Sequence, residues 1–584
     1  MLKNKLTRVA SAAALAVGVF LVPVAANASG TTAVVSLDNA VVGWNNATSA
    51  NNDYRLGLML NLITPSPYYL DATGKLVLNR NYVNSVTSAI KGGKQVVTYV
   101  INPKAVWSDN VPINADDFIY IYQALSCNDA FKDKGGASYD AAGCSGYNQI
   151  ESVVGTLPKT AAGGALTCDA GSSANRNAGL CPNGKTVTVT FKAGQTYPEW
   201  QGLFGLLPAH IVRAVGFNSG YDNDDDALTN VVSGGPYKLS SFNRTNNNYT
   251  FVKNPRWWGA EGKLDTIVFK DLGDDNNGIA GLEAGDYNVF EPTAITATIK
   301  AQADAADVSS QIKKGYQFEH LDFNMGTGSD YNVGPGNDAV RKLGVRQAIA
   351  YALNRDALIA ATAGSIYNTE VLNSRIFMIG QNGYKDNGKA YNIGGLAAGR
   401  TKAKQLLTTA GYKFNTNDEM FHIGSTTGPV LTLKLVMNGT SARQTEAQLI
   451  QSMLRLVGIK VNIATAPNSD SLSHTVSYDM VIFAWVGSPF LSGNKDIYGC
   501  DGGSNYGGYC NTAVTAKMTS ANKSLTLAAE TTLYAAADKA MWADMPTIPI
   551  YQKANFAAWK GVSGVVVNPT SAGITWNADT WSHQ

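Results

Sequence analysis

The side chains that most often carry catalysis are present in this sequence but do not form a known catalytic pattern. Its five histidines lie far apart, at His210, His320, His422, His474 and His583. None has a second histidine at the spacing of a zinc site. The serine of Gly424-Ser425-Thr426-Thr427-Gly428 stands one place too early for a nucleophile elbow, and Gly326-Thr327-Gly328 lacks the third glycine of a dinucleotide-binding loop. These patterns give no support for hydrolytic, metal-dependent or nucleotide-dependent chemistry.

Paired carboxylates, which could act as general acid and base, occur at Asp116-Asp117 and at Asp274-Asp275. The first pair follows Asn114 at the predicted start of a helix, and the second lies in a predicted turn. Capping and solvation account for both pairs. We therefore expect the protein not to be an enzyme and to need no cofactor and no metal. A secreted hydrolase with an unrecognised site is the least favoured alternative.

The amino-terminal residues have the layout of a secretory signal peptide. Lys3, Lys5 and Arg8 precede an apolar stretch over residues 9–22, and Ala26-Asn27-Ala28 supplies small residues for cleavage. We predict a signal peptide over residues 1–28 and an extracytoplasmic mature protein. No cysteine precedes Cys127, so we expect no lipid attachment site and a soluble product. Cleavage removes three cations and leaves a nearly neutral chain, which gives no reason to expect nucleic acid or anionic lipid as a partner.

All cysteines lie in the predicted exported part, and each has one other cysteine close by in the sequence. An oxidising compartment favours disulfides, although other connectivities are formally possible. The predicted pairs are Cys127–Cys144, Cys168–Cys181 and Cys500–Cys510. No C-x-x-C motif occurs and no histidine adjoins a pair, so these cysteines are not expected to bind metal. Their predicted role is to staple polar loops.

The clearest structural pattern lies between residues 431 and 463. Leu431, Leu433, Leu435 and Met437 alternate as in a half-buried strand, and apolar residues on one face of 441–457 predict a helix. Ser441 with Gln444 resembles a capping box. Alternation resumes over 459–463, so the segment predicts a βαβ unit. With a further helix over 345–353 and β-rich runs such as 186–191, the fold class is α/β.

Several segments, in order along the chain, resemble the ABC-importer solute-binding proteins that include the dipeptide- and oligopeptide-binding proteins, known as family 5. Val106–Phe118 is similar to a motif in which a tryptophan, a Ser-Asp-Gly turn and a proline precede a helix beginning with two aspartates. Asn110 replaces the glycine. The other similar segments are Leu207–Ile211, Gly234–Leu239, Asn254–Trp258, Leu282–Asp286, Val345–Asp356 and Tyr534–Tyr551. Most of the motif residues, including Trp107, Trp258 and His210, are expected to be structural.

The resemblance implies a type II periplasmic-binding-protein-like fold with two lobes and a β-rich subdomain on the first. The predicted division assigns 29–70, 190–292 and 553–584 to lobe I, 71–189 to the subdomain with its disulfide-stapled insertion, and 293–552 to lobe II. The lobes would close around a ligand by hinge motion. The protein would act as a monomer that captures peptides and delivers them to an ABC permease, with the cognate ATPase acting indirectly.

The ligand site implied by the resemblance centres on Trp485, Val486, Gly487 and Ser488. In the peptide-binding relatives a similar W-x-x-D stretch supplies an aspartate that pairs with the peptide ammonium group, whereas this sequence has Ser488 there. A hydroxyl cannot neutralise a cation. Either another carboxylate supplies the charge, or the ligand has no free amino terminus. Further candidates are Asn438, Asn324, Tyr68 and Tyr69, and the alternative ligands are an oligosaccharide or a metal chelate.

Overall fold

The computed structural model describes residues 31–37, 41, 43–49, 51–156, 167–169, 184–218, 227–243, 246–292, 294–327, 331–467, 472 and 474–584. The predicted signal peptide and Cys181 lie outside these ranges, as does the side chain of Cys168. Within the described ranges, no helix combines the length and the apolar character that a membrane span requires.

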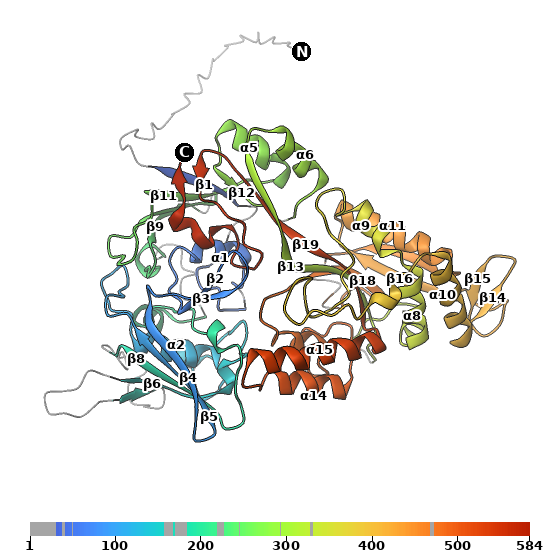
Figure 1. Cartoon of the computed structure of the whole chain (residues 1–584), viewed down its shortest axis with the longest axis horizontal. Helices are drawn as coiled ribbons and strands as arrows, with labels where there is room; N and C mark the ends of the chain where they lie inside the picture. The colour runs from blue at the N-terminus through green and yellow to red at the C-terminus, as the bar shows by residue number, and fades with distance from the viewer. Residues whose placement is uncertain are drawn as a thin grey trace, which may run out of the picture.

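A single ten-stranded sheet runs through both lobes (Figure 1). In spatial order its strands are β17 (Lys460–Thr465), β16 (Thr432–Met437), β18 (Met480–Val486), β13 (Ser309–Phe323), β19 (Thr547–Trp559), β12 (Val289–Phe290), β1 (Thr32–Leu37), β11 (Thr266–Asp271), β10 (Asn248–Lys253) and β9 (Tyr237–Asn243).

The two longest strands, β13 and β19, carry the chain between the lobes. They pair antiparallel from Ser309 opposite Trp559, beside the first lobe, to Asp322 opposite Thr547, inside the second. The register shifts between Lys314 and Phe318, and such an irregularity bends and twists the pair locally. The crossing therefore consists of two paired strands with a break near their middle.

The second lobe contains the predicted βαβ unit. Strands β16 and β17 are parallel, with Leu433 opposite Val461, and α11 (Ser441–Arg455) connects them. The predicted capping box is wrong: the N-cap is Thr440 without a side-chain cap, and the Gln444 amide donates to the carbonyl of Gly439. Buried apolar side chains of α8 (Leu343–Ala352) and α11 pack on the sheet and form the core of this lobe.

The β-rich subdomain is built on a five-stranded sheet. Its strands are β4 (Val83–Lys91), β5 (Lys94–Ile101), β8 (Thr186–Phe191), β6 (Ile150–Thr156) and β7 (Thr167–Asp169). Helix α2 (Ala115–Leu125) covers the sheet and begins with a capping box between Asn114 and Asp117. The subdomain core also includes Tyr197 and Phe204, which the predicted division assigns to lobe I. The domain boundaries remain a prediction.

The motif residues described next make contacts that stabilise the fold, as expected for structural residues. Trp107 is buried and its Nε1 donates to Asp117 Oδ2 at 3.4 Å, and His210 Nε2 lies 2.7 Å from Asp109 Oδ2 at the turn before α2. Arg346 donates to the carbonyls of Asp544 and Met545. It therefore satisfies backbone acceptors at the carboxyl end of α15 (Leu527–Asp544).

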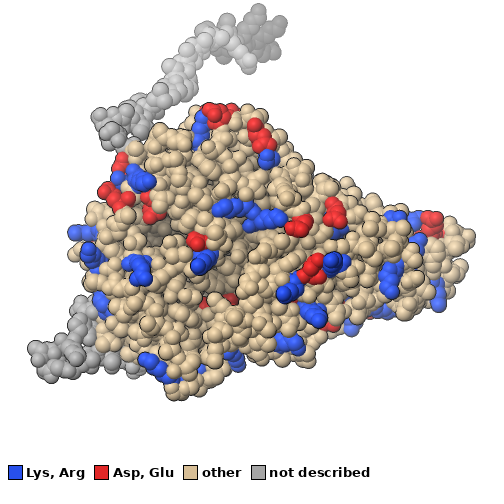
Figure 2. Space-filling model, viewed as in Figure 1, with Lys and Arg blue, Asp and Glu red and all other residues tan. Residues whose placement is uncertain are grey.

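Short hairpins and helices complete the fold. The hairpins are β2 (Tyr68–Leu70) with β3 (Leu76–Leu78), β14 (Lys413–Asn415) with β15 (Met420–His422), and β20 (Val562–Ser563) with β21 (Ser582–His583). The other α-helices of the described ranges are α1 (Tyr54–Leu60), α3 (Ala209–Val215), α4 (Ala227–Asn230), α5 (Gly278–Ala284), α6 (Ala297–Ala305), α7 (Asn337–Val340), α9 (Arg355–Ala361), α10 (Ala397–Thr409), α13 (Asn494–Tyr498) and α14 (Thr512–Ala521). On the face in Figure 2, basic and acidic side chains are interspersed.

Candidate ligand-binding site

The predicted segment Trp485–Ser488 lies at the boundary between the lobes. It forms the end of β18, where Trp485 pairs with Phe318 and Val486 with Gln317 on the crossing strand β13. The Gly487 amide then donates to the carbonyl oxygen of Tyr316 at 2.7 Å. A Cβ atom at position 487 would stand 2.1 Å from that oxygen. Only glycine can therefore follow the strand at this point.

The indole ring of Trp485 is half-buried among other aromatic side chains. The ring of Phe483 meets it edge-on with centroids 5.1 Å apart, and the ring of Tyr506 stacks on it at 5.8 Å. Its Nε1 atom is buried, and no acceptor for its hydrogen lies among the described residues. A buried donor without an acceptor destabilises a protein by about 1–3 kcal/mol. A ligand carbonyl bound at Nε1 would remove that penalty.

A polar pair continues from Trp485 along the same face of the sheet. His320 and Asp322 alternate with Leu321 and Phe323, which pack into the core of the second lobe, so the pair lies on the opposite face. His320 is fully buried, and its Nε2 lies 3.4 Å from Asp322 Oδ1. This face therefore carries a row of aromatic and polar side chains rather than a purely apolar one.

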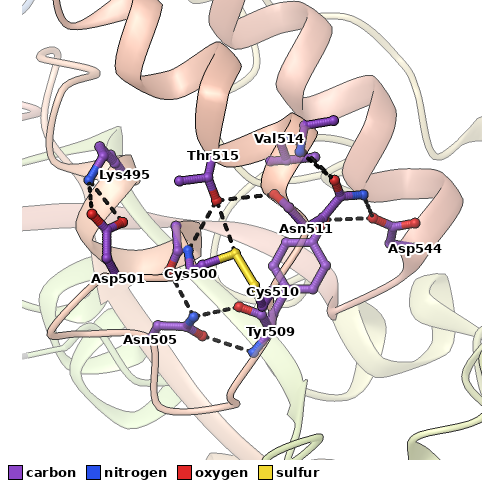
Figure 3. The surroundings of a disulfide bond; sticks show 12 residues. Lys495, Cys500, Asp501, Asn505, Tyr509, Cys510, Asn511, Val514, Thr515 and Asp544 are labelled. Atoms are coloured by element: carbon purple, nitrogen blue, oxygen red, sulfur yellow. Dashed lines mark hydrogen bonds and ion pairs between the residues drawn. A yellow bond between two sulfur atoms is a disulfide. The ribbon is translucent and has the colours of Figure 1, made fainter.

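Tyr506 is held over Trp485 by a disulfide-closed loop. Cys500 and Cys510 form the disulfide, and both residues are exposed (Figure 3). Inside the loop the Asn505 amide donates to the carbonyls of Gly499 and Tyr509. The Tyr509 hydroxyl donates to Asp544 Oδ2 at 2.6 Å, which ties the loop to the end of α15. Together these contacts fix the position of the Tyr506 ring.

On the first-lobe side, the hairpin of β2 and β3 meets the crossing strands. The ring of Tyr68 meets that of Trp200 edge-on at 5.9 Å, whereas Tyr69 is 41% exposed. At the turn of the hairpin, a Cβ on Gly74 would lie 3.1 Å from the ring of Tyr316. The hairpin with Tyr68 and the segment with Trp485 therefore contact the same residue from opposite lobes.

Two of the predicted site residues, Asn324 and Asn438, make hydrogen bonds to nearby protein groups. Asn324 is fully buried; its amide donates to the carbonyl of Tyr478 and its side-chain oxygen accepts from the amide of Gly326. Asn438 follows β16, and its Oδ1 accepts from Thr440 Oγ1 at 3.3 Å. Asn324 braces the chain after β13, so we do not carry it into the proposed site. Asn438 remains in the proposed site, because it follows β16 at the same end of the sheet as Trp485 on the parallel strand β18.

The hydroxyl group of Ser488 makes one local hydrogen bond. The residue is exposed, and its Oγ accepts from the backbone amide of Phe490 at 3.1 Å. The side chain of Val486 lies outside the described atoms. Position 488 therefore offers a hydroxyl group and no carboxylate.

Sequence reasoning missed the residues that surround Trp485 from a distance. Tyr506 comes from the disulfide loop and His320 from the crossing strand. Trp200, in the 3₁₀ turn Trp200–Gly202, instead meets the ring of Tyr68 on the first-lobe side. The spacing of Cys500 and Cys510 marked the loop as stapled. No local pattern indicated what the loop packs against.

The comparison with protein families agrees with this arrangement. The sequence model of the bacterial extracellular solute-binding proteins, family 5, matches residues 85–508. The chain belongs to this family. Among curated relatives, the oligopeptide-binding protein OppA of Mycobacterium tuberculosis is 26% identical over 517 residues, covering 86% of this chain and 76% of OppA.

Solved structures share the fold along nearly the whole chain. The periplasmic EDTA-binding protein EppA superposes with a TM-score of 0.79 at 24% identity, covering 95% of this chain and 96% of EppA. The oligopeptide-binding protein AppA of Bacillus subtilis, solved with a nonapeptide, superposes with a TM-score of 0.68 at 19% identity, covering 95% and 99%. The two-lobed α/β fold of the family 5 proteins is therefore the fold of this chain.

The relatives correct the predicted localisation. A protein of Mycobacterium tuberculosis that is 22% identical over 553 residues, 88% of this chain, is named a lipoprotein. The expectation of a protein without a lipid attachment site is therefore withdrawn. It depended on the position of a single residue type, whereas relatives of this chain are named lipoproteins. An extracytoplasmic location agrees with the family.

Removal of the Cys500–Cys510 disulfide is expected to weaken solute binding. Replacing both cysteines by serine frees the loop that carries Tyr506. It also lowers the free energy of unfolding by about 3 kcal/mol, because the unfolded chain is no longer cross-linked. Solute-induced stabilisation, followed by thermal unfolding, should fall. The matched control removes Cys127–Cys144, which lies in the subdomain insertion and should leave the response to solute unchanged. Equal responses in both variants would contradict a positioning role for the loop.

Proposed function

We propose that this family 5 protein captures peptides between its two lobes and delivers them to the permease of an ABC importer, whose ATPase acts indirectly. The Nε1 of Trp485, at the junction of the lobes, carries the proposal, because it has no acceptor in the part of the chain that the structure describes and a peptide offers carbonyl acceptors at regular spacing. The naming of OppA and the nonapeptide bound to AppA support peptides as the ligand class. The protein is expected to act as a monomer.

The end of β18 is suited to an extended peptide. Strand β16 ends at Met437, which pairs with Ile482, so β18 continues past its parallel neighbour through Phe483–Val486. An extended chain can add to such an edge through main-chain hydrogen bonds. Because these bonds do not depend on side chains, the expected binding has low sequence specificity. Trp485 and Tyr506 would add contact area beside the peptide.

Lobe closure is the proposed means of capture. The chain passes between the lobes in β13 and β19, whose register breaks between Lys314 and Phe318. A ligand that contacts both lobes binds the closed form better than the open form, and that difference shifts the population. The closed form would then be the one that docks on the permease.

Thermal unfolding with a panel of ligands tests the ligand class. We expect pentapeptides and nonapeptides to raise the melting temperature, because a ligand at 100 times its Kd stabilises the folded state by about 2.7 kcal/mol. The panel includes amino-terminally acetylated peptides, which show whether a free ammonium group is required now that Ser488 replaces the aspartate. A response to Fe(III)-EDTA or an oligosaccharide alone would favour the alternative ligands. Recovery of cleaved peptide would favour a hydrolase.

A further inference from the structure

The second lobe closes directly onto the β-rich subdomain. Helices α14 and α15 lie beside the subdomain in Figure 1. The Gln149 side-chain amide donates to the carbonyl of Asn522 at 3.1 Å, and the Thr196 hydroxyl donates to the carbonyl of Lys523. Gly202 leaves room for Phe490, since a Cβ there would stand 2.7 Å from the Phe490 ring. This contact is specific and closely packed.

One carboxylate from the subdomain is buried in this contact. Glu199 is 2% exposed, and it accepts the backbone amides of Leu491 and Ser492 from the opposite lobe. The Tyr197 hydroxyl donates to the second carboxylate oxygen at 3.3 Å. Glu199 thus has several donors and is well placed to carry a negative charge.

A second carboxylate, from the second lobe, faces it. Glu530 lies in the first turn of α15 and is 1% exposed. Neither of its oxygens has a hydrogen-bond partner among the described residues. Tyr534, one turn further along α15, donates its hydroxyl to the carbonyl of Ser492, and the Ser492 amide donates to Glu199, so both carboxylates border the same buried cluster. Two carboxylates can bond to each other only when one holds a proton. Two ionised carboxylates buried side by side would repel each other strongly.

The described groups around the two carboxylates do not neutralise their negative charge, so a proton must do so. The segment before Trp200 contributes Tyr197, α15 contributes Tyr534, and the loop between α14 and α15 contributes Lys523, whose side chain is exposed. Both phenols are neutral because burial holds the pKa of each well above its ordinary value. Burial, and then the charge of Glu199, raises the pKa of Glu530 to about 9. Burial also raises the pKa of Glu199.

We infer that closure of the lobes takes up one proton, which Glu530 holds and donates to Glu199 across the interface. The inference rests on the hinge motion of the proposed function, because separation of the lobes would return both side chains to water. In the open form both carboxylates are ionised at neutral pH. In the closed form one is protonated, so the pair acts as a pH-dependent latch.

The direction of the pH dependence follows from the raised pKa. The closed form has its full stability below the ordinary glutamate pKa of 4.5, and this contribution is lost as the pH rises through about 9. Because closure binds one more proton than the open form, the ratio of closed to open molecules should fall by about tenfold for each pH unit between these values.

Small-angle X-ray scattering of the ligand-free protein tests the latch without any solute. We expect the radius of gyration of the wild type to rise as the pH increases from 5 to 9. Glu530→Gln, which keeps the shape of the protonated acid, should stay compact over the same range. Glu530→Met, a second variant without an ionisable group at this position, should stay compact as well. Circular dichroism establishes that each variant is folded.

Glu446→Gln is the matched control, because Glu446 is fully buried inside the second lobe and burial with the charge of Glu319 raises its pKa to about 8. This variant should keep the dimensions and pH dependence of the wild type. A wild type whose dimensions do not depend on pH, or a Glu530→Gln variant that expands like the wild type, would overturn the latch. A protein that shows the pH dependence but responds to no peptide would instead refute the proposed peptide ligand.

Discussion

Trp485→Ala should abolish the stabilisation of the protein by peptides while leaving the ligand-free protein folded. Aromatic side chains at the centre of a binding site typically account for about 2 kcal/mol or more of binding free energy. That loss corresponds to a roughly thirtyfold or greater weakening of affinity. The substitution removes both the stacking surface next to Tyr506 and the buried Nε1 donor. Titration calorimetry with a pentapeptide measures the change.

Two further variants separate the contributions of the indole ring. Trp485→Phe keeps an aromatic ring but removes the donor, so affinity should fall by only about 0.5–1.5 kcal/mol, the net contribution of one hydrogen bond. Trp257→Ala is the control, since Trp257 is half-buried in the first lobe and its Nε1 already donates to the carbonyl of Ala260. Unchanged affinity in Trp485→Ala would show that the ligand binds elsewhere.

Arg443→Met should destabilise the second lobe by about 3–5 kcal/mol at neutral pH, the usual effect of removing one partner of a buried ion pair. Arg443 donates from Nε and Nη2 to Glu319 at 2.6 and 3.2 Å, and Lys553 lies 3.3 Å from the same carboxylate. Glu319 is 1% exposed and lies on β13 directly after its register shift. The cluster therefore joins α11 to both crossing strands.

The loss should depend on pH in a defined direction. Burial alone would raise the pKa of Glu319, but Lys553 and Arg443 hold it below its usual range. A lowered pKa contributes stability above the ordinary carboxyl pKa and loses it as the pH falls. The difference between wild type and Arg443→Met should therefore be larger at pH 7 than at pH 3, as measured by urea unfolding at both values.

Arg455→Met is the matched control for this prediction. Arg455 lies at the other end of α11, is exposed, and donates only to the backbone carbonyls of Asp418 and Glu419. Its loss should change the free energy of unfolding by well under 1 kcal/mol, as for most exposed positions away from special contacts. An equal loss in both variants would contradict the role of the buried cluster at the crossing strands.

Local patterns in the sequence determined several parts of this structure. The alternation in 431–437 and 459–463 predicted parallel strands around a helix, and β16, α11 and β17 have that arrangement. Asn114 and Asp117 predicted the start of α2, and both cap it. Cys500 and Cys510, close in sequence, form a disulfide. Each of these features depends on residues within about one element of each other, where spacing along the chain also sets spacing in space.

The capping box at Ser441 marks the limit of local reasoning. The pattern was present, yet the helix begins one residue earlier at its N-cap, Thr440, and Gln444 bonds to Gly439. Competing hydrogen bonds of similar strength are available at a helix start, and packing of α11 on the sheet selects among them. Element boundaries are therefore less determined by local sequence than element types.

The sequence by itself determined the family and the elements that build its two lobes, but only the tertiary structure decided which side chains meet at their junction. Tyr506 reaches Trp485 through a loop fixed to α15, and Glu199 faces Glu530 from another lobe. Burial and the charge of neighbours depend on which segments fold against each other. Spacing along the chain does not encode these contacts, because hundreds of residues separate the partners of the carboxylate pair.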